Sequence, residues 1–139
     1  MMTIVCGFPP NFDAIAAAFP MDKFTRAIFC YGSTIYNPSG GAISEALVEH
    51  EAVHEAQQGS SINEWWRAYI VDPAFRLAQE IPAHQREYEV FCETARDRVA
   101  RRLYLSNISR RLASPLYGNL ITLDRARTLI KGFSKRDPS

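Results

Sequence analysis

The sequence has few cysteines, and their positions form no recognisable pattern. Cys6, Cys30 and Cys92 are odd in number and lie far apart, and no CxxC pair occurs. A disulfide framework in a small secreted domain needs an even number of cysteines, and a thiolate zinc site needs cysteine pairs. The sequence therefore argues against both kinds of site and favours a reducing compartment.

Long apolar runs and an excess of one charge are also missing. The longest apolar stretch near the N-terminus, residues 14–19, is shorter than a signal peptide or a membrane span requires, and no basic segment precedes it. We therefore expect a cytoplasmic protein with no membrane partner. The formal net charge of +1 attracts polyanions only weakly, so we expect no nucleic-acid partner either.

One local exception to the balanced charge is an arginine-rich segment that contains Arg96, Arg98, Arg101, Arg102, Arg110 and Arg111. Glu93 and Asp97 are interleaved with these arginines, and no ladder of aromatic residues accompanies them. The pattern favours a solvated helix face. A nucleic-acid adaptor is the weaker alternative, which a steep salt dependence of DNA binding would support.

Length and composition are those of one globular domain that covers residues 1–139. The chain is 47% hydrophobic and 22% charged, which is far from the composition of disordered proteins and sufficient to bury one core. Residues 27–31 and 34–36 are rich in apolar, aromatic and β-branched side chains and are separated by Gly32-Ser33. This pattern predicts a β-hairpin with a two-residue turn.

Helical patterns account for most of the remaining sequence. A short helix is predicted at about residues 13–19, a longer one at about residues 42–58, and a last one at about residues 122–130, started by Thr122 or Asp124. Together with the hairpin, these helices indicate a mainly α protein with a small β element, which is an α+β class.

Two sequence signals predict helix starts in the middle of the chain. Ser61-Ile62-Asn63-Glu64 matches a capping box, and Asp72-Pro73 places a capping residue before a proline at the first helical position. We expect Trp65 and Trp66 to occupy one core position and one rim position, because adjacent residues on a helix face different directions.

Pro82 is expected to kink or restart the helix that begins at Pro73. Beyond Pro82, apolar residues recur at spacings of three or four, which predicts one long amphipathic helix with its apolar stripe against a core. The stripe consists of Tyr88, Cys92, Ala95, Val99 and Leu103.

The pentapeptide His50-Glu51-Ala52-Val53-His54 carries the strongest chemical signal. Histidines four residues apart on a helix lie about 5–6 Å from one another at Cβ, so both imidazoles can reach one Zn²⁺. Glu51 points along the rim of the same face, where its carboxylate can accept a proton from a water molecule that the metal activates. A catalytic zinc keeps three protein ligands and one open position, so a third ligand is needed.

Four residues downstream of the motif are candidates for this third ligand: Glu64, Glu80, His84 and Glu87. Glu80 and Glu87 lie on the following helices, from which a side chain can pack back against the HExxH helix. The residues alone leave the choice between them open.

Four segments, HEAVHEAQQG, WWRAY, DPAFRLAQEIPAH and SPLYGNLITLDRAR, resemble small single-domain zinc peptidases that bacteriophages and prophages encode and that are similar to minimal gluzincins. The resemblance covers most of the chain. In such families a helix bearing Glu-x-x-Ala-Tyr completes the site, so the resemblance implies Glu80 as the third zinc ligand. His84 stands in place of the tyrosine and Pro82 interrupts the helix. His84 could therefore turn toward the metal or hydrogen-bond the site, and Glu87 is a reserve ligand.

The resemblance implies a zincin-like domain and a zinc-dependent peptidase in which Glu51 activates water. Tyr117 would donate its phenol to the oxyanion, as a tyrosine or histidine often does in gluzincins, or would only anchor the tail. The hairpin strand within residues 27–36 resembles the edge strand along which zincins align an extended peptide, which would make it part of the substrate cleft.

A further implication of the resemblance is a phage or prophage gene whose product acts in the bacterial host cytoplasm or in the virion. Its partners would be a protein or peptide substrate and other phage virion or assembly proteins. The alternative is a non-catalytic phage structural or assembly protein that uses the same fold and metal as a rigid module. Glu51 favours the enzyme, because a purely structural zinc site does not need a general base.

Overall fold

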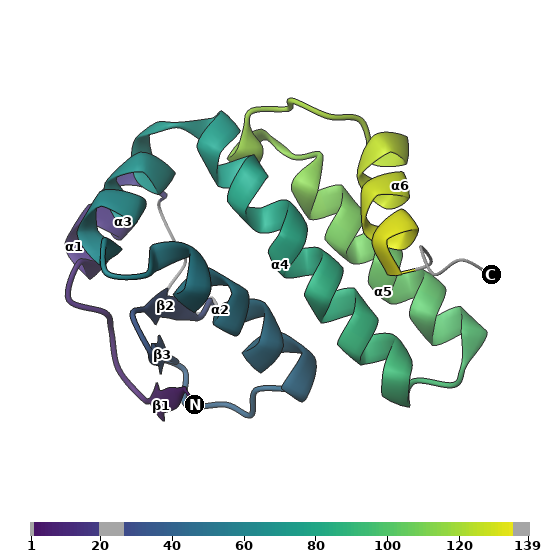
Figure 1. Cartoon of the computed structure of the whole chain (residues 1–139), viewed down its shortest axis with the longest axis horizontal. Coiled ribbons are helices and arrows are strands. Elements are labelled where there is room, and N and C mark those ends of the chain that lie inside the picture. The colour runs from purple at the N-terminus through teal and green to yellow at the C-terminus, as the bar shows by residue number, and fades with distance from the viewer. Residues whose placement is uncertain (1, 20–26, 135–139) are drawn as a thin grey trace.

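The computed structural model of the protein describes residues 2–19 and 27–134, which form a mainly helical structure with one small sheet (Figure 1). α4 lies in the middle, with α2 and the sheet on one side and α5 and α6 on the other (Figure 1). The predicted mainly α class with a small β element is confirmed. In chain order the elements are β1 (Thr3–Val5), α1 (Phe12–Ala18), β2 (Phe29–Tyr31), β3 (Thr34–Tyr36), α2 (Glu45–Gln58), α3 (Ile62–Val71), α4 (Pro73–Thr94), α5 (Arg98–Leu112), the 3₁₀ turn η1 (Pro115–Tyr117) and α6 (Leu123–Ser134).

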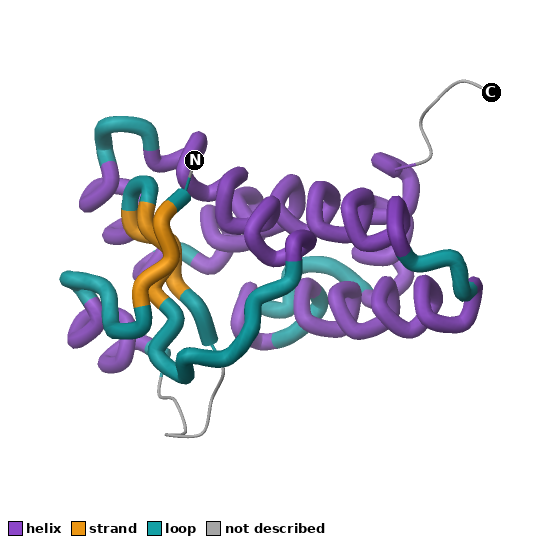
Figure 2. Tube along the Cα trace, turned by 90° about the horizontal axis from the view of Figure 1, so that it is seen from below, coloured by secondary structure: helices purple, strands orange, loops and turns teal. Residues whose placement is uncertain are grey.

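The sheet has the strand order β1-β3-β2 and lies toward one end of the molecule (Figure 2). β2 and β3 form the predicted antiparallel hairpin, in which Cys30 is paired with Ile35. β1 pairs with β3 in parallel and is absent from the sequence prediction. Its three residues are all exposed, so no alternation of buried and exposed side chains marks this strand in the sequence.

The buried side chain of Gln58, at the end of α2, holds the hairpin in place. Its Nε2 donates a hydrogen bond to the Cys30 carbonyl at 2.8 Å, and its Oε1 accepts one from the Gly32 amide at 2.7 Å. Trp66 Nε1 donates to the same Cys30 carbonyl at 3.1 Å. These bonds satisfy backbone groups of β2 and the turn, and they fix β2 against α2 and α3.

Replacing Gln58 with alanine is therefore expected to lower the free energy of unfolding by about 1–3 kcal/mol, because the Gly32 amide loses its buried partner. Urea denaturation followed by circular dichroism measures the change. An unaltered midpoint in the variant would contradict a stabilising role for this side chain.

The long helix predicted across residues 88–103 is wrong. α4 continues through Pro82 without restarting and ends at Thr94, and α5 begins at Arg98. The Asp97 side chain accepts a hydrogen bond from the Val99 amide at 3.0 Å and so caps a new helix. Val99 and Leu103 are 54% and 59% exposed. The buried residues of α5 are instead Leu105, Ile108, Ser109 and Leu112.

The other helix starts agree with the prediction in part. The Asp72 side chain caps α4 through the Ala74 amide at 3.0 Å, as predicted. α3 begins after Ser61 as predicted, but the Ser61 side chain makes no capping hydrogen bond. The capping box is therefore wrong: the Ser61 backbone, at φ −110° and ψ 51°, is not in the extended conformation that such a cap uses.

Trp65 and Trp66 are both buried, so the expected division into core and rim is wrong. α3 is enclosed on two sides: the indole of Trp66 reaches Cys30 of the hairpin, and Trp65 Nε1 donates to Gln79 Oε1 of α4 at 2.9 Å. Among the helices in residues 2–19 and 27–134, none combines the length and apolar character that crossing a membrane requires.

Candidate metal centre

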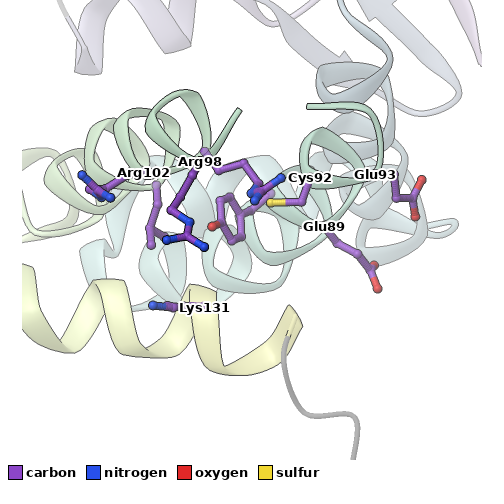
Figure 3. A pocket seen from close by; sticks show the side chains of 9 residues that line it. Glu89, Cys92, Glu93, Arg98, Arg102 and Lys131 are labelled. Atoms are coloured by element: carbon purple, nitrogen blue, oxygen red, sulfur yellow. The ribbon is translucent and has the colours of Figure 1, made fainter. Parts of the chain in front are cut away.

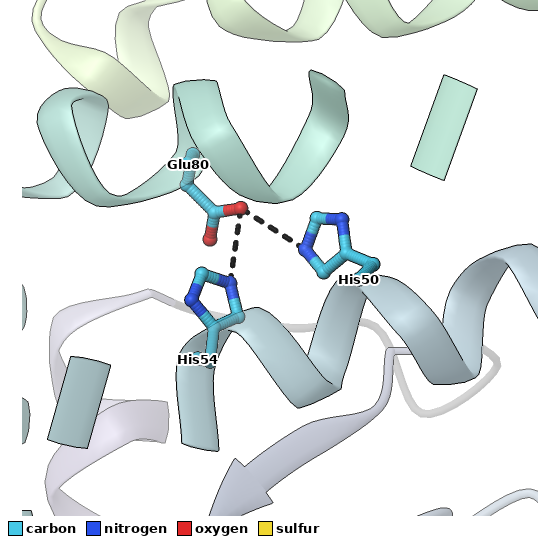
Figure 4. Close-up of side chains that lie close together, drawn as sticks. All are labelled: His50, His54 and Glu80. Atoms are coloured by element: carbon cyan, nitrogen blue, oxygen red, sulfur yellow. Dashed lines mark hydrogen bonds and ion pairs between the residues drawn. The ribbon is translucent and has the colours of Figure 1, made fainter. Parts of the chain in front are cut away.

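The two histidines of the HExxH motif face Glu80 across the interface between α2 and α4 (Figure 4). Glu80 Oε1 lies 3.1 Å from His50 Nε2 and 3.2 Å from His54 Nε2, and all three side chains are buried. These three residues form one of the sets of side chains that could hold a metal ion. The structure therefore brings together the three predicted ligands.

Two of the spacings between these atoms fit a tetrahedral zinc ion. With metal–ligand bonds of about 2.0–2.1 Å, adjacent ligand atoms of a tetrahedral site are about 3.3 Å apart. The two histidine-to-Glu80 distances of 3.1 and 3.2 Å are close to this value. Two imidazoles and one carboxylate are also a donor set typical of catalytic zinc.

Glu87 fixes the tautomer of His50. Its Oε1 lies 2.9 Å from His50 Nδ1. Burial raises the pKa of Glu87, but hydrogen bonds from His50 and His84 outweigh this effect and hold the pKa well below its usual range. An ionised carboxylate only accepts hydrogen bonds, so His50 Nδ1 carries the proton and donates it. Loss of the proton from His50 Nε2 would leave a lone pair directed toward Glu80, as a metal ligand requires.

Gln57 fixes the tautomer of His54 in the same way. Its Nε2 donates to the Gln79 backbone carbonyl at 2.9 Å, which orients the amide so that Oε1 faces His54. His54 Nδ1 lies 2.8 Å from this oxygen and must donate to it, because an amide oxygen only accepts. His54 Nε2 is therefore also available to a metal.

A tyrosine holds the second oxygen of Glu80. The Tyr69 hydroxyl donates to Glu80 Oε2 at 2.6 Å. Tyr117 lies beside Tyr69 and is also close enough to Glu80 for the charge of that carboxylate to act on it. Burial and the charge of Glu80 raise the pKa of both tyrosines, so both keep their protons. The hydrogen bond from Tyr69 to Oε2 leaves Glu80 Oε1 as the oxygen that faces the histidines.

Replacing Tyr69 with phenylalanine is expected to weaken zinc binding by about 10–100-fold, because outer hydrogen-bond partners orient the ligands. Competition titration with a chelating dye measures the zinc affinity. Tyr31→Phe is the matched control, since the Tyr31 hydroxyl bonds Asn63 on the surface. Equal affinities of the two variants would show that Tyr69 does not position Glu80.

Glu51 lies beside the three predicted ligands. Its carboxylate is buried, and Oε2 is 3.9 Å from His50 Nε2. Burial raises the pKa of Glu51, and the neighbouring His50 and His54 oppose this effect only in part. A carboxylate with a raised pKa, close to the metal position and outside the converging donor set, has the properties of a general base at neutral pH.

His84 and Glu87, the reserve candidates, form a hydrogen-bonded group behind His50. Glu87 Oε1 accepts from His84 Nδ1 at 2.8 Å as well as from His50, and Glu87 Oε2 accepts from the Tyr104 hydroxyl at 2.5 Å. His50, His84 and Glu87 are a second set that could hold a metal. Glu87 Oε1 lies 2.9 Å from His50 Nδ1 and 2.8 Å from His84 Nδ1, whereas the spacings at Glu80 are 3.1 and 3.2 Å, so the set with Glu80 is closer to the spacing of about 3.3 Å in a tetrahedral zinc site.

The outer partners Gln57, Tyr69 and Tyr104 are missing from the sequence prediction. Gln57 stands three residues after His54 on the same helix, and this spacing was sufficient to suggest the contact. Tyr69 and Tyr104 reach the site from α3 and α5. No local pattern indicates which tyrosine packs against which glutamate, because these contacts depend on how the helices assemble.

A cavity of about 710 Å³ opens onto the site, and its lining includes His50, Glu51, Glu80 and Tyr117. Residues 27–28, immediately before β2, also line it. Residues 29–30 line a smaller cavity that also contains Glu51 and Glu80, so part of the segment 27–36 borders the site, and its role in aligning a substrate stays a prediction. Within β2 itself the Cys30 carbonyl is occupied by side chains of α2 and α3.

The arginine-rich segment lines a different cavity, of about 640 Å³, that shares no lining residue with the metal centre. Figure 3 shows Arg98, Arg102 and Lys131 on one side of this cavity, with Glu89 and Glu93 extending on the other. Arg98 and Arg102 are exposed, as predicted for a solvated helix face.

Comparison of the chain with protein-family models, curated proteins and solved structures finds no significant match. The resemblance to phage zinc peptidases thus stays a prediction from the sequence. Any conclusion about function depends on the geometry of the site.

Proposed function

We propose that the protein is a zinc-dependent peptidase that binds one Zn²⁺ through His50, His54 and Glu80 and uses Glu51 as the general base. The observation that carries the proposal is a further buried carboxyl group, that of Glu51, placed beside three converging donor atoms but outside the donor set. A site that served only to hold the fold together would not need this group.

In peptide hydrolysis, bound zinc would polarise the substrate carbonyl and lower the pKa of a water molecule to about 7. Glu51 would accept a proton from this water as its oxygen bonds to the carbonyl carbon. The carbon–nitrogen bond then breaks, and Glu51 returns the proton to the leaving amine. Tyr117 lines the same cavity, and its assignment as a hydrogen-bond donor to the oxyanion stays a prediction.

The proposal includes the zincin-like fold and the phage or prophage origin that the resemblance implies. The site of action would be the bacterial host cytoplasm or the virion, and the substrates would be phage or host proteins. The buried, hydrogen-bonded ligands would serve equally well in a non-catalytic virion or assembly module, which is the alternative outcome.

A cleavage screen tests the proposal. Zinc-reconstituted protein is incubated with a broad peptide library and with candidate phage proteins, and cleavage is followed by mass spectrometry. We expect cleavage that a chelator abolishes and added zinc restores. Tight zinc binding without any zinc-dependent cleavage would favour the structural module instead.

Zinc binding is expected to tighten as the pH rises. Burial lowers the pKa of His50 and His54, but Glu80 outweighs burial at both residues, assisted by Glu87 at His50, and their pKa values lie above the ordinary value of 6.5. Zinc binds neutral imidazole, so at lower pH it must displace these protons. The affinity should fall by about tenfold per pH unit for each displaced proton.

Competition titrations at several values between about pH 5.5 and 7.5, corrected for protonation of the competing chelator, measure this dependence. An affinity that stays flat over this range would show that zinc does not displace protons from the two histidines.

A further inference from the structure

A second cavity adjoins the metal centre and differs from the first in its chemistry. It has a volume of about 260 Å³ and shares six lining residues with the larger cavity described above: Ala27, Ile28, Glu51, Tyr69, Glu80 and Leu116. Its other walls are almost entirely apolar, with aromatic rings on several sides. These walls include Ile15, Phe19, Phe29, Trp65 and Trp66.

Rigid contacts hold the aromatic walls in place. The ring of Trp65 lies 5.3 Å from that of His54 and is stacked on Tyr69 at 4.9 Å. The indole of Trp66 is fixed by its hydrogen bond to the Cys30 carbonyl. The cavity is therefore bounded by side chains that are themselves held, which is typical of preformed binding pockets.

The volume suits one apolar side chain. A cavity of about 150 Å³ lined by aliphatic and aromatic residues is known to accept benzene, whereas pockets for whole small molecules occupy about 300–1,000 Å³. At about 260 Å³, this cavity has room for one aromatic or large aliphatic side chain. Glu51 and Glu80 stand at its boundary with the larger cavity, so such a side chain would lie next to the reacting peptide bond.

We propose that this apolar cavity binds an aromatic or large aliphatic side chain of the substrate, so that the protein cleaves peptide bonds adjacent to such a residue. The inference rests on the proposed peptidase function. The larger cavity, whose lining includes Asn107 and Arg111, offers polar groups to the remainder of the peptide. The cavity on one side of the metal centre would thus select an apolar side chain, and the cavity on the other side would accept polar groups of the peptide.

The first test measures binding without cleavage. N-acetyl-phenylalanine amide and N-acetyl-glycine amide are titrated into the purified protein in the presence of zinc and followed by NMR. We expect the phenylalanine compound to bind at least ~10-fold more tightly, since burying such a side chain contributes about 1.5–3 kcal/mol. Equal affinities for the two compounds would overturn the proposal.

Two variants localise the binding. Ala27→Leu adds bulk where Ala27 lines the cavity, and it should weaken binding of the phenylalanine compound by at least ~10-fold. Because Ala27 also lines the larger cavity, Leu47→Phe, which adds bulk to the larger cavity alone, is the matched control, and its affinity should equal that of the wild type. Ile28→Ala enlarges the same cavity and should shift the preference toward larger side chains such as tryptophan. Unchanged binding in both cavity variants would place the compound elsewhere and refute the inference.

Cleavage-site sequencing provides an independent comparison. Where the wild type cleaves the peptide library, the bonds should adjoin aromatic or large aliphatic residues, and Ala27→Leu should shift cleavage toward smaller ones. A library cleaved without such a preference would contradict the apolar cavity as a specificity site. If the protein binds the phenylalanine compound in the cavity and cleaves no peptide, that result would contradict the peptidase function. The binding site itself would still stand.

Discussion

Replacing Glu80 with alanine is expected to weaken zinc binding by roughly 10²- to 10³-fold. Zinc sites contribute about 10–16 kcal/mol, which about four ligands share, so removing one ligand costs about 3 kcal/mol or more. Glu87→Gln should cost only about tenfold, because the glutamine would keep an oxygen that accepts from His50 Nδ1. Competition titration with a chelating dye measures both affinities, and circular dichroism verifies that both variants fold.

Comparing the losses of zinc affinity in Glu80→Ala and Glu87→Gln distinguishes the two possible sets of metal ligands. If Glu87→Gln abolished zinc binding while Glu80→Ala retained it, the metal would belong with His50, His84 and Glu87. That result would also remove Glu51 from its assigned role, because the metal would then lie on the Nδ1 side of His50 and no longer beside the Glu51 carboxylate.

Glu51→Gln is expected to reduce zinc-dependent peptide hydrolysis by at least ~10²-fold, the lower end of what a positioned general base contributes. The glutamine has the same shape and keeps a hydrogen-bonding oxygen, but it does not accept the proton. Zinc content and melting temperature should therefore stay close to those of the wild type. Steady-state cleavage of a fluorogenic peptide, with elemental analysis of the same samples, measures both properties.

Glu55→Gln is a suitable control for this variant, because Glu55 lies on the same helix outside the donor set. It should retain full activity. A Glu51→Gln protein that cleaves as fast as the control would show that another group accepts the proton. A Glu51→Gln protein that loses its zinc would show that Glu51 acts as a ligand.

The hairpin and most helix starts could be predicted because local signals define them. Asp72-Pro73 and the turn at residues 32–33 each combine special residues with a clear change of pattern. The break between α4 and α5 was missed because the apolar spacing continues across it, while Asp97 alone marks the new start. β1 was missed because its pairing with β3 is a long-range contact that leaves no mark within three exposed residues.

For the metal centre, the sequence was informative where residues are close along one helix. His50, Glu51 and His54 follow from the HExxH spacing, whereas Glu80 was chosen from a resemblance and is brought near by the packing of α4 against α2. The hydrogen bonds that orient the ligands come from Gln57, Tyr69 and Glu87 on α2, α3 and α4. Which tyrosine reaches which carboxylate depends on the assembled structure, and local periodicity holds no information about it.

The most direct measurement is a crystal structure of the zinc-loaded protein with anomalous scattering recorded at the zinc absorption edge. We expect one strong anomalous peak per chain, about 2.0–2.2 Å from His50 Nε2, His54 Nε2 and a Glu80 oxygen, with the Glu51 carboxylate outside bonding distance. A peak between His50 Nδ1, His84 and Glu87, or no peak at either position, would contradict the account.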